Sequence, residues 1–218
     1  MKKILLIFLI PFFTYSCSKK ESTPTFISPA VIPIITIGTQ KWMGKNLDVV
    51  TYRNGDTIPQ VTDAIKWGRL TTGAWCYYNN DAANGTKYGK LYNWYAVNDS
   101  RGLAPLGWHM PSDAEWTTLS TFLGGEVSAG GKLKELGTLN WQTPNKLATN
   151  DVGFSALPGG YHSGDGSFYY VGDIGSWWSA TENSRTGAWG RSLNYYNGTL
   201  GRDFYYKGNG FSVRCLKD

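Results

Sequence analysis

The distribution of apolar and polar residues predicts a chain whose character changes beyond its midpoint. From Gly153 onward, short apolar stretches alternate with glycine-rich turns about every ten residues, which is typical of an antiparallel sheet. Nearer the N-terminus, the pattern predicts a pair of strands within residues 36–43 and a buried strand at 75–78. The strands predicted in the C-terminal half are 154–157, 168–171, 176–180, 188–195, 200–205 and 211–215.

Helices are predicted mainly before that point. Ser112 stands three residues before Glu115, and this spacing predicts a capping box at the start of a helix. An apolar stripe beginning at Trp116 follows at helical spacing, and Gly124-Gly125 predicts the helix end. Helices followed by meandering strands predict an α+β fold. Shorter helical segments are predicted at 63–67, 88–97 and 132–136.

The N-terminus has the pattern of an export signal. Two lysines, Lys2 and Lys3, precede an apolar run of about ten residues at 4–13. A membrane-spanning helix needs roughly 20 apolar residues, so this run is too short to span a membrane. We therefore predict that residues 1–16 are a secretory signal peptide.

The predicted signal peptide is followed by Cys17, and the sequence TYSC at this point resembles the lipobox of bacterial lipoproteins. The resemblance implies that Cys17 is acylated and becomes the new N-terminus, with ordinary secretory cleavage as the alternative. Residues 17–35 are rich in Ser, Thr and Pro and are predicted to form the lipidated cysteine and its tether. The predicted domain is 36–218. Because buried acyl chains anchor a protein firmly, we expect it at a membrane, on the outer membrane or cell surface.

The composition favours an aromatic-rich domain and excludes one class of partner. The 218 residues include 10 Trp and 14 Tyr, while charged residues make up 17% against about 25% in average soluble domains. The formal net charge is +5; without Lys2 and Lys3, two of the 21 basic residues, 19 remain against 16 acidic ones, a net charge of +3. These charges are scattered. A nucleic-acid partner is not expected, because no run of Lys and Arg could follow a phosphate backbone.

Five motifs, taken in order, give the chain a resemblance to a known family. They are GKLYNWYAV at 89–97, GWHMPSDAEW at 107–116, LPGGY at 157–161, WWSATE at 177–182 and GFSVRC at 210–215. From about residue 36 to the C-terminus, the chain resembles the Fibrobacter succinogenes major paralogous domain family. The resemblance implies an exported, often lipid-anchored protein, and it implies no defined biochemical activity.

A more distant similarity suggests the arrangement of the fold. The order of the tryptophan, arginine and cysteine motifs is similar to that of C-type-lectin-like folds and of formylglycine-generating enzymes. It implies a C-type-lectin-like arrangement of a few short helices and an antiparallel, turn-rich sheet. The formylglycine-generating activity itself is not expected, because this chain has no pair of redox cysteines between Trp177 and Gly210.

Two cysteines follow Cys17, and the sequence leaves their state open. In an exported chain, Cys76 and Cys215 either form a disulfide or remain two buried thiols. A disulfide closing so long a loop would contribute about 4–5 kcal/mol to stability if it were unstrained.

The residues give little support to metal-dependent or hydrolytic chemistry. His109 and His162 are the only histidines and do not form a zinc-binding motif, and the chain has no Gly-x-Ser-x-Gly. We therefore assign no catalytic residue, no metal ligand and no cofactor. Calcium alone stays open, because Asn and Asp at 79–81, 98–99 and 150–151 could supply oxygen ligands, although turn formation is the simpler role.

The aromatic residues of the C-terminal half are the best functional hint, because flat Trp and Tyr faces stack on sugar rings and on partner side chains. Neighbouring residues of a strand face opposite sides, so either Trp177 or Trp178 is expected at the surface if only one face of the sheet is covered. For Glu182 and Arg191, the alternative to ligand binding is a structural role, either as a pair or as supports of turns. The candidate ligand-binding residues are Trp177, Trp178, Glu182, Trp189 and Arg191.

These features together favour a membrane-anchored, non-catalytic binding or adhesion module. We expect it to recognise a glycan or an envelope protein through aromatic residues. Two alternatives belong to other classes: a hydrolase or modifying enzyme of the cell envelope, and a structural envelope lipoprotein. The enzyme would require a concave pocket with convergent carboxylates or a base of perturbed pKa.

Overall fold

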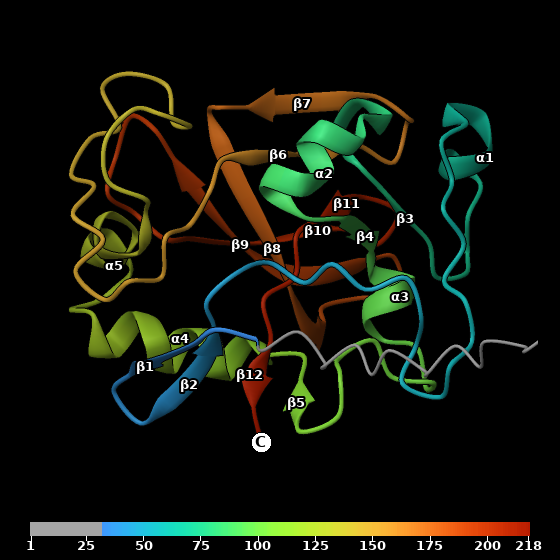
Figure 1. Cartoon of the computed structure of the whole chain (residues 1–218), viewed down its shortest axis with the longest axis horizontal. Helices are drawn as coiled ribbons and strands as arrows, with labels where there is room; N and C mark the ends of the chain where they lie inside the picture. The colour runs from blue at the N-terminus through green and yellow to red at the C-terminus, as the bar shows by residue number, and fades with distance from the viewer. Residues whose placement is uncertain (1–31) are drawn as a thin grey trace, which may run out of the picture. The chain divides into compact units, whose positions relative to one another are not determined.

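The computed structural model describes residues 32–218 (Figure 1). The predicted signal peptide, the lipid attachment site at Cys17 and most of the tether lie outside the described residues. Within the described part of the chain, no helix combines the length and the apolar character that crossing a membrane requires.

Residues 32–218 form two sheets and a few short helices, which confirms the predicted α+β fold. The helices are α1 (Ala64–Gly68), α2 (Ala82–Tyr88), α3 (Trp94–Val97), α4 (Asp113–Phe122) and α5 (Glu126–Leu133), with a 3-10 turn, η1, at Tyr78–Asn80. The larger sheet contains β3 (Trp75–Cys76), β4 (Leu91–Asn93), β6 (Gly159–His162), β7 (Phe168–Val171), β8 (Ile174–Glu182), β9 (Gly187–Asn194), β10 (Gly201–Tyr206) and β11 (Gly210–Phe211). The smaller sheet contains β1 (Ile34–Ile37), β2 (Gln40–Met43), β5 (Trp108–His109) and β12 (Leu216–Lys217).

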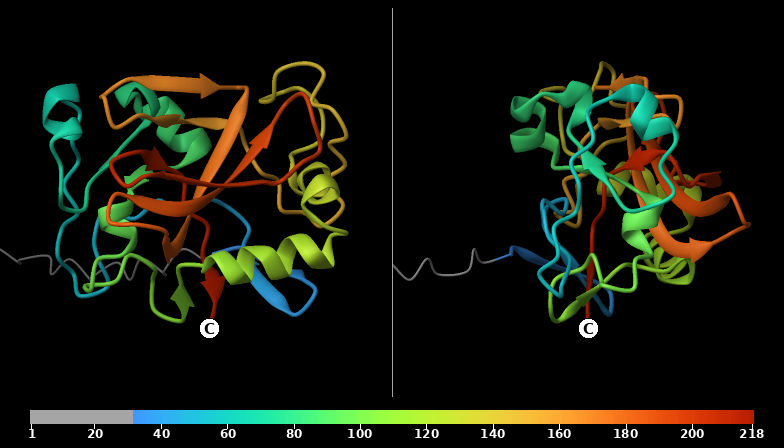
Figure 2. Two further views of the ribbon diagram at one scale, coloured as in Figure 1. Left: turned by 180° about the vertical axis from the view of Figure 1, so that it is seen from behind. Right: turned by 90° about the vertical axis from the view of Figure 1, so that its right-hand side faces the viewer.

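The strand order joins segments that lie far apart in the sequence. The larger sheet has the order β10-β9-β8-β6-β11-β4-β3, and β7 pairs with β6. Its pairs are antiparallel except for β6 and β8, which run parallel. The smaller sheet has the order β1-β2-β12-β5, so the last strand of the domain pairs with the N-terminal hairpin. Figures 1 and 2 show this small sheet with the C-terminus at the lower end of the domain.

Both faces of the larger sheet are covered, and this decides the surroundings of its aromatic residues. Trp177 and Trp178 are consecutive residues of β8 and belong to different hydrophobic clusters. Trp177 packs in the cluster that includes Trp116 of α4 and Leu133 of α5. Trp178 packs in the cluster that includes Phe211 of β11. Because burying a large apolar side chain contributes roughly 1.5–3 kcal/mol, these two tryptophans are major parts of the core.

The capping box predicted at the start of α4 is present. The Oγ of Ser112 accepts a hydrogen bond from the backbone N–H of Glu115 at 3.2 Å, and the backbone N–H of Ser112 donates to Glu115 Oε2 at 2.7 Å. Helix α4 buries Trp116 on its inner face. It ends as predicted, because Gly124 and Gly125 take positive φ values of 96° and 93° that a helix cannot contain.

Residues 88–97 differ from the prediction, since they form a strand followed by one helical turn. Leu91–Asn93 is strand β4, paired with β3 and β11. The side-chain oxygen of Asn93 accepts from the backbone N–H of Ala96 at 3.1 Å and so caps α3. Leu91 and Trp94 have helical spacing in the sequence, but a strand end and a helix start separate them.

Four other segments also differ from the prediction. Helix α5 begins at Glu126 rather than near residue 132, and α2 was not predicted. Residues 154–157 do not form a named strand, because Ser155 has a φ of 50°, outside the extended region. Of the predicted strand 211–215, only Phe211 lies in a named strand, β11, and the next strand, β12, begins at Leu216 in the smaller sheet. The N-terminal hairpin, α1, β3, β7, β8, β9 and β10 are confirmed, with ends shifted by a few residues at most.

Candidate binding surface

Three tyrosine rings gather on the paired strands β6 and β7 of the larger sheet. Tyr161 lies opposite Tyr169 in the β6–β7 pair, and their ring centroids are 5.6 Å apart. The ring centroid of Tyr170 is 6.0 Å from that of Tyr161 and 5.9 Å from that of Tyr169. Tyr169 is 38% exposed and Tyr170 is 52% exposed, while Tyr161 is half-buried. Tyr161, Tyr169 and Tyr170 are called the tyrosine cluster below.

An unusual backbone conformation brings two consecutive tyrosines together. In a regular strand, the side chains of neighbouring residues face opposite sides of the sheet. Tyr170 instead has a φ of 61°, a left-handed conformation that costs roughly 1–2 kcal/mol for a residue with a side chain. The ring of Tyr170 therefore lies near both Tyr161 and Tyr169. Strain of this kind persists only where the surrounding structure imposes it, and it concentrates at functional sites.

Aromatic rings of the core pack against the buried side of the tyrosine cluster. The ring of Tyr161 meets Phe211 edge to face at 5.7 Å, and Phe211 stacks on Trp178 at 4.4 Å. Burial raises the pKa of Tyr161, with smaller contributions from the neighbouring tyrosines. Its hydroxyl therefore stays protonated at neutral pH and can both donate and accept a hydrogen bond. The cluster thus offers apolar ring surface and polar groups on a rigid base.

The sequence did not single out the tyrosine cluster, although it contained part of the signal. The strand 168–171 was predicted, and Tyr161 closes the motif at 157–161. Alternation along a strand would have placed Tyr169 and Tyr170 on opposite faces. Only the left-handed conformation of Tyr170 joins them, and no local sequence pattern indicates it.

The burial of Trp177 and Trp178 corrects the prediction that one of them contacts a ligand. Both are fully buried, because the larger sheet is covered on its two faces. The indole N–H of Trp177 donates to Asn46 Oδ1 at 2.9 Å, and that of Trp178 donates to the Tyr92 carbonyl at 2.9 Å. Their polar atoms are therefore used within the core, and neither ring is available at the surface.

Arg191 is also buried, so the prediction that it contacts a ligand is corrected for the same reason. Its Nη1 lies 2.5 Å from Oδ1 of Asp113, the first residue of α4. The same carboxylate pairs with Arg202 at 2.8 Å. The partner of Arg191 is therefore Asp113 rather than Glu182, and the pair fastens α4 to β9 within the structure.

The remaining two candidates, Trp189 and Glu182, do reach the surface. Trp189 is half-buried, and the guanidinium of Arg202 lies over its ring at 3.7 Å from the centroid. Arg202 thus occupies a ring face that a sugar would need. Glu182 is exposed, and its Oε1 accepts from Lys207 Nζ at 2.7 Å. Ligand contact by Trp189 or Glu182 stays a prediction.

The two cysteines of the domain are free thiols, so the disulfide alternative is corrected. Cys76 belongs to a hydrophobic cluster with Trp67, whereas Cys215 belongs to the separate cluster of Trp178. Burial raises the pKa of both thiols, that of Cys215 to about 12. Because the thiolate is the reactive form, both cysteines are inert packing residues at neutral pH.

Residues of the three segments considered for calcium make local structural contacts; Asn150 Oδ1, for example, accepts from the Ser155 N–H at 2.8 Å. Asn79 and Asn80 have left-handed φ values of 52° and 56°, and Asp81 caps α2 by accepting from the Ala83 N–H at 2.9 Å. The carboxylate of Asp99 pairs with Arg101 at 2.8 Å. Across residues 32–218, His, Cys, Asp and Glu side chains nowhere meet in a group of three or more that could hold a metal ion.

The two histidines make structural contacts. His109 contacts Asp218 at 2.7 Å and Glu115 at 2.9 Å, so it links the C-terminus to α4. His162 is buried, with its ring centroid 4.3 Å from that of Trp67 and 4.2 Å from that of Phe168.

Comparison with known proteins identifies the family. The model of the Fibrobacter succinogenes major domain matches residues 35–217, which is nearly the whole of the described part of the chain. No curated protein and no solved structure matches the chain significantly. The C-type-lectin-like arrangement therefore stays a prediction. The match of the family model agrees with the five sequence motifs, and the chain belongs to the Fibrobacter succinogenes major domain family.

Proposed function

We propose that the protein is a non-catalytic binding module of the cell envelope that recognises a glycan through the tyrosine cluster. A lipid on Cys17 would hold the module at the outer membrane or the cell surface. The observation that carries this proposal is the gathering of three tyrosine rings, of which Tyr169 and Tyr170 are exposed and Tyr170 has a left-handed backbone.

The chemistry of the cluster supports a sugar as its ligand. Tyrosine combines a flat apolar face with a hydroxyl that donates and accepts hydrogen bonds, and it has few rotatable bonds to immobilise on binding. Tyr161 is further held in place by its contact with Phe211. A pyranose ring presents apolar C–H groups beside hydroxyls, which matches such a surface.

The size of the cluster favours a glycan over a protein partner. An aromatic side chain presents roughly 150–250 Å² in all, so three partly exposed rings offer about 200–300 Å². A stable protein interface buries about 800 Å² on each partner. The cluster is therefore small for a protein interface and suitable for one or two sugar rings.

A glycan array tests the proposal most broadly. The chain from Ser18 onward would be screened with calcium and with a chelator, alongside the variants Tyr170→Ala and Tyr196→Ala. Tyr196 is a matched control, because it is 55% exposed and contacts the ring of Tyr195 rather than the cluster. Glycans retained by the wild type and by Tyr196→Ala but lost by Tyr170→Ala are the expected result. Retention of the same glycans by all three proteins would refute the role of the cluster.

The two alternative functions predicted from the sequence, an envelope enzyme and a structural lipoprotein, stay predictions. A structural lipoprotein would give no specific signal on the array. An enzyme would convert an envelope glycan or peptide into products, which mass spectrometry would detect.

A further inference from the structure

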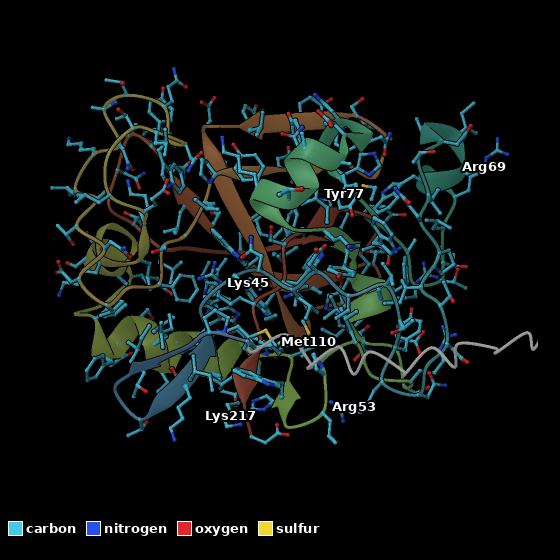
Figure 3. The ribbon with its side chains drawn as sticks, viewed as in Figure 1. Lys45, Arg53, Arg69, Tyr77, Met110 and Lys217 are labelled. Carbon is cyan, nitrogen blue, oxygen red and sulfur yellow. The ribbon has the colours of Figure 1, made fainter. Side chains whose placement is uncertain are left out.

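A cavity of about 250 Å³ lies beside α2, away from the tyrosine cluster. Its walls include the loop after β2, which carries Lys45 and Asn46, the second half of α2 with Lys87, and Arg214. Figure 3 labels Lys45 on this loop, below α2. Pockets for drug-sized ligands have roughly 300–1,000 Å³, so this cavity suits a small ion or the end group of a larger molecule.

Arg214 is the unusual residue of this cavity. It lines the cavity but is only 1% exposed, and burial lowers its pKa to about 9, so it still carries its charge at neutral pH. Its Nε and Nη2 donate to Asn46 Oδ1, and its Nη1 donates to the Phe154 carbonyl. A guanidinium has five N–H donors. Within residues 32–218, two of the five therefore have no protein acceptor.

The acceptors that Arg214 does have are neutral and shared. Asn46 Oδ1 also accepts from the indole N–H of Trp177 at 2.9 Å, so three donors compete for one carbonyl oxygen with two lone pairs. The ring of Phe154 lies 4.0 Å from the guanidinium and offers some compensation. No carboxylate of the described residues forms an ion pair with Arg214.

The other buried cations of residues 32–218 are better compensated. Lys90, Arg191 and Lys207 each pair with a carboxylate. Lys134 has no acidic partner, but its three N–H groups donate to three backbone carbonyls. Arg214 alone among them lacks both a carboxylate and a full set of acceptors. Because an uncompensated buried charge costs several kcal/mol, such an arrangement is expected where an anion completes it.

The mouth of the cavity is positive. Lys45 and Lys87 are exposed lining residues, and neither pairs with an acid of the described chain. Of the two acidic lining residues, Asp48 pairs with Lys90, while Glu135 accepts only from the neutral amide of Asn140 at 2.9 Å and so retains its negative charge. Arg214, Lys45 and Lys87 outweigh this one charge. The charges left free to meet a ligand are therefore mainly cationic.

We propose that Arg214, Lys45 and Lys87 form a binding site for the oxyanion group of a ligand, a carboxylate, sulfate or phosphate. The planar guanidinium would supply the two free N–H groups to oxygen atoms of the anion, and the two lysines would supply charge at the entrance. This site uses none of the residues of the tyrosine cluster and does not depend on its function.

Titration of the full chain with small anions tests the site. Sodium acetate, glucuronate, sulfate and phosphate would be added at constant ionic strength against chloride. The readouts are the melting temperature and the NMR resonance of the Arg214 Nε–H group. At least one oxyanion should raise the melting temperature and shift this resonance saturably. The anion that binds most tightly assigns the ligand class to carboxylate, sulfate or phosphate.

Matched variants separate the site from general charge effects. Lys45→Ala/Lys87→Ala should weaken oxyanion binding about tenfold, because two exposed cations near the anion are lost. Lys41→Ala/Lys66→Ala removes the same charge at exposed positions outside the cavity and should leave the affinity unchanged. Tyr170→Ala should also bind oxyanions normally. An Arg214 resonance that no oxyanion shifts, or equal weakening in both lysine pairs, would overturn the proposal.

Discussion

Replacing Tyr170 by glycine should barely change the stability of the domain, although the change removes a whole aromatic ring. Tyr170 has a φ of 61°, which glycine adopts without steric cost. Tyr169, the neighbouring residue, has no positive φ and serves as the matched position. The same substitution at both sites removes a partly exposed ring of the same cluster.

The expected difference follows from three contributions. Loss of a half-buried ring costs about 1 kcal/mol at either position, since full burial of a large side chain contributes roughly 1.5–3 kcal/mol. Glycine adds a further cost of about 0.5–1 kcal/mol through the unfolded chain. Tyr169→Gly should therefore destabilise by about 2 kcal/mol. At Tyr170, relief of roughly 1–2 kcal/mol of left-handed strain offsets most of this loss, which leaves a net change of about 0–1 kcal/mol.

Urea denaturation followed by tryptophan fluorescence measures both variants. The midpoint of Tyr169→Gly should fall clearly below that of Tyr170→Gly, with equal slopes for the two transitions. Both variants should lose glycan binding, because each lacks one ring of the cluster. Equal destabilisation by the two substitutions would show that Tyr170 carries no strain, and the view of the cluster as a built feature would then be wrong.

Three further predictions concern the core, the pH dependence and the anchor. Asp113→Ala leaves Arg191 buried without its carboxylate and should lower the free energy of unfolding by about 3–5 kcal/mol. Asp203→Ala, at an exposed position, should change it little in the same urea assay. A small effect of both substitutions would mean that the pair of Asp113 and Arg191 is not important for stability. Burial lowers the pKa of His162 from 6.5 to about 4. Between pH 6.5 and about 4, the unfolded chain therefore binds a proton at this residue that the folded protein does not. The free energy of unfolding should fall as the pH falls through this range, by at most about 1.4 kcal/mol per pH unit. Thermal melts of His162→Gln should show a shallower fall over this range, and an unchanged slope would contradict the assignment. Cys17→Ser should abolish incorporation of labelled palmitate and release the protein from the membrane fraction; labelling that persists would disprove lipid attachment at this residue.

Local signals in the sequence were sufficient for the elements that depend on neighbouring residues. The start of α4 follows from the reciprocal hydrogen bonds of Ser112 and Glu115, which a spacing of three residues makes possible. The strands β8 to β10 follow from apolar stretches between glycine-rich turns. The five motifs, taken in order, were also sufficient to recognise the family, whose family model matches residues 35–217.

The candidate sites depended on contacts that no local pattern records. Whether Trp177 or Trp178 reaches the surface is decided by α4, α5 and β11, which come from distant parts of the chain. The free donors of Arg214 depend on Asn46, which lies 168 residues away in the sequence. The strain at Tyr170 comes from a left-handed backbone conformation that tyrosine disfavours. The residue type therefore predicts an ordinary extended conformation at this position.

The affinity of one glycan for three proteins tests the central claim most directly. The glycan retained most strongly on the array would be titrated calorimetrically into the wild type, Tyr169→Ala and Tyr196→Ala. Loss of one stacking ring at the centre of a binding site should weaken the affinity at least about tenfold in Tyr169→Ala, and Tyr196→Ala should bind like the wild type. Equal affinity in all three proteins, or an array that retains no glycan, would contradict recognition of a sugar by the tyrosine cluster.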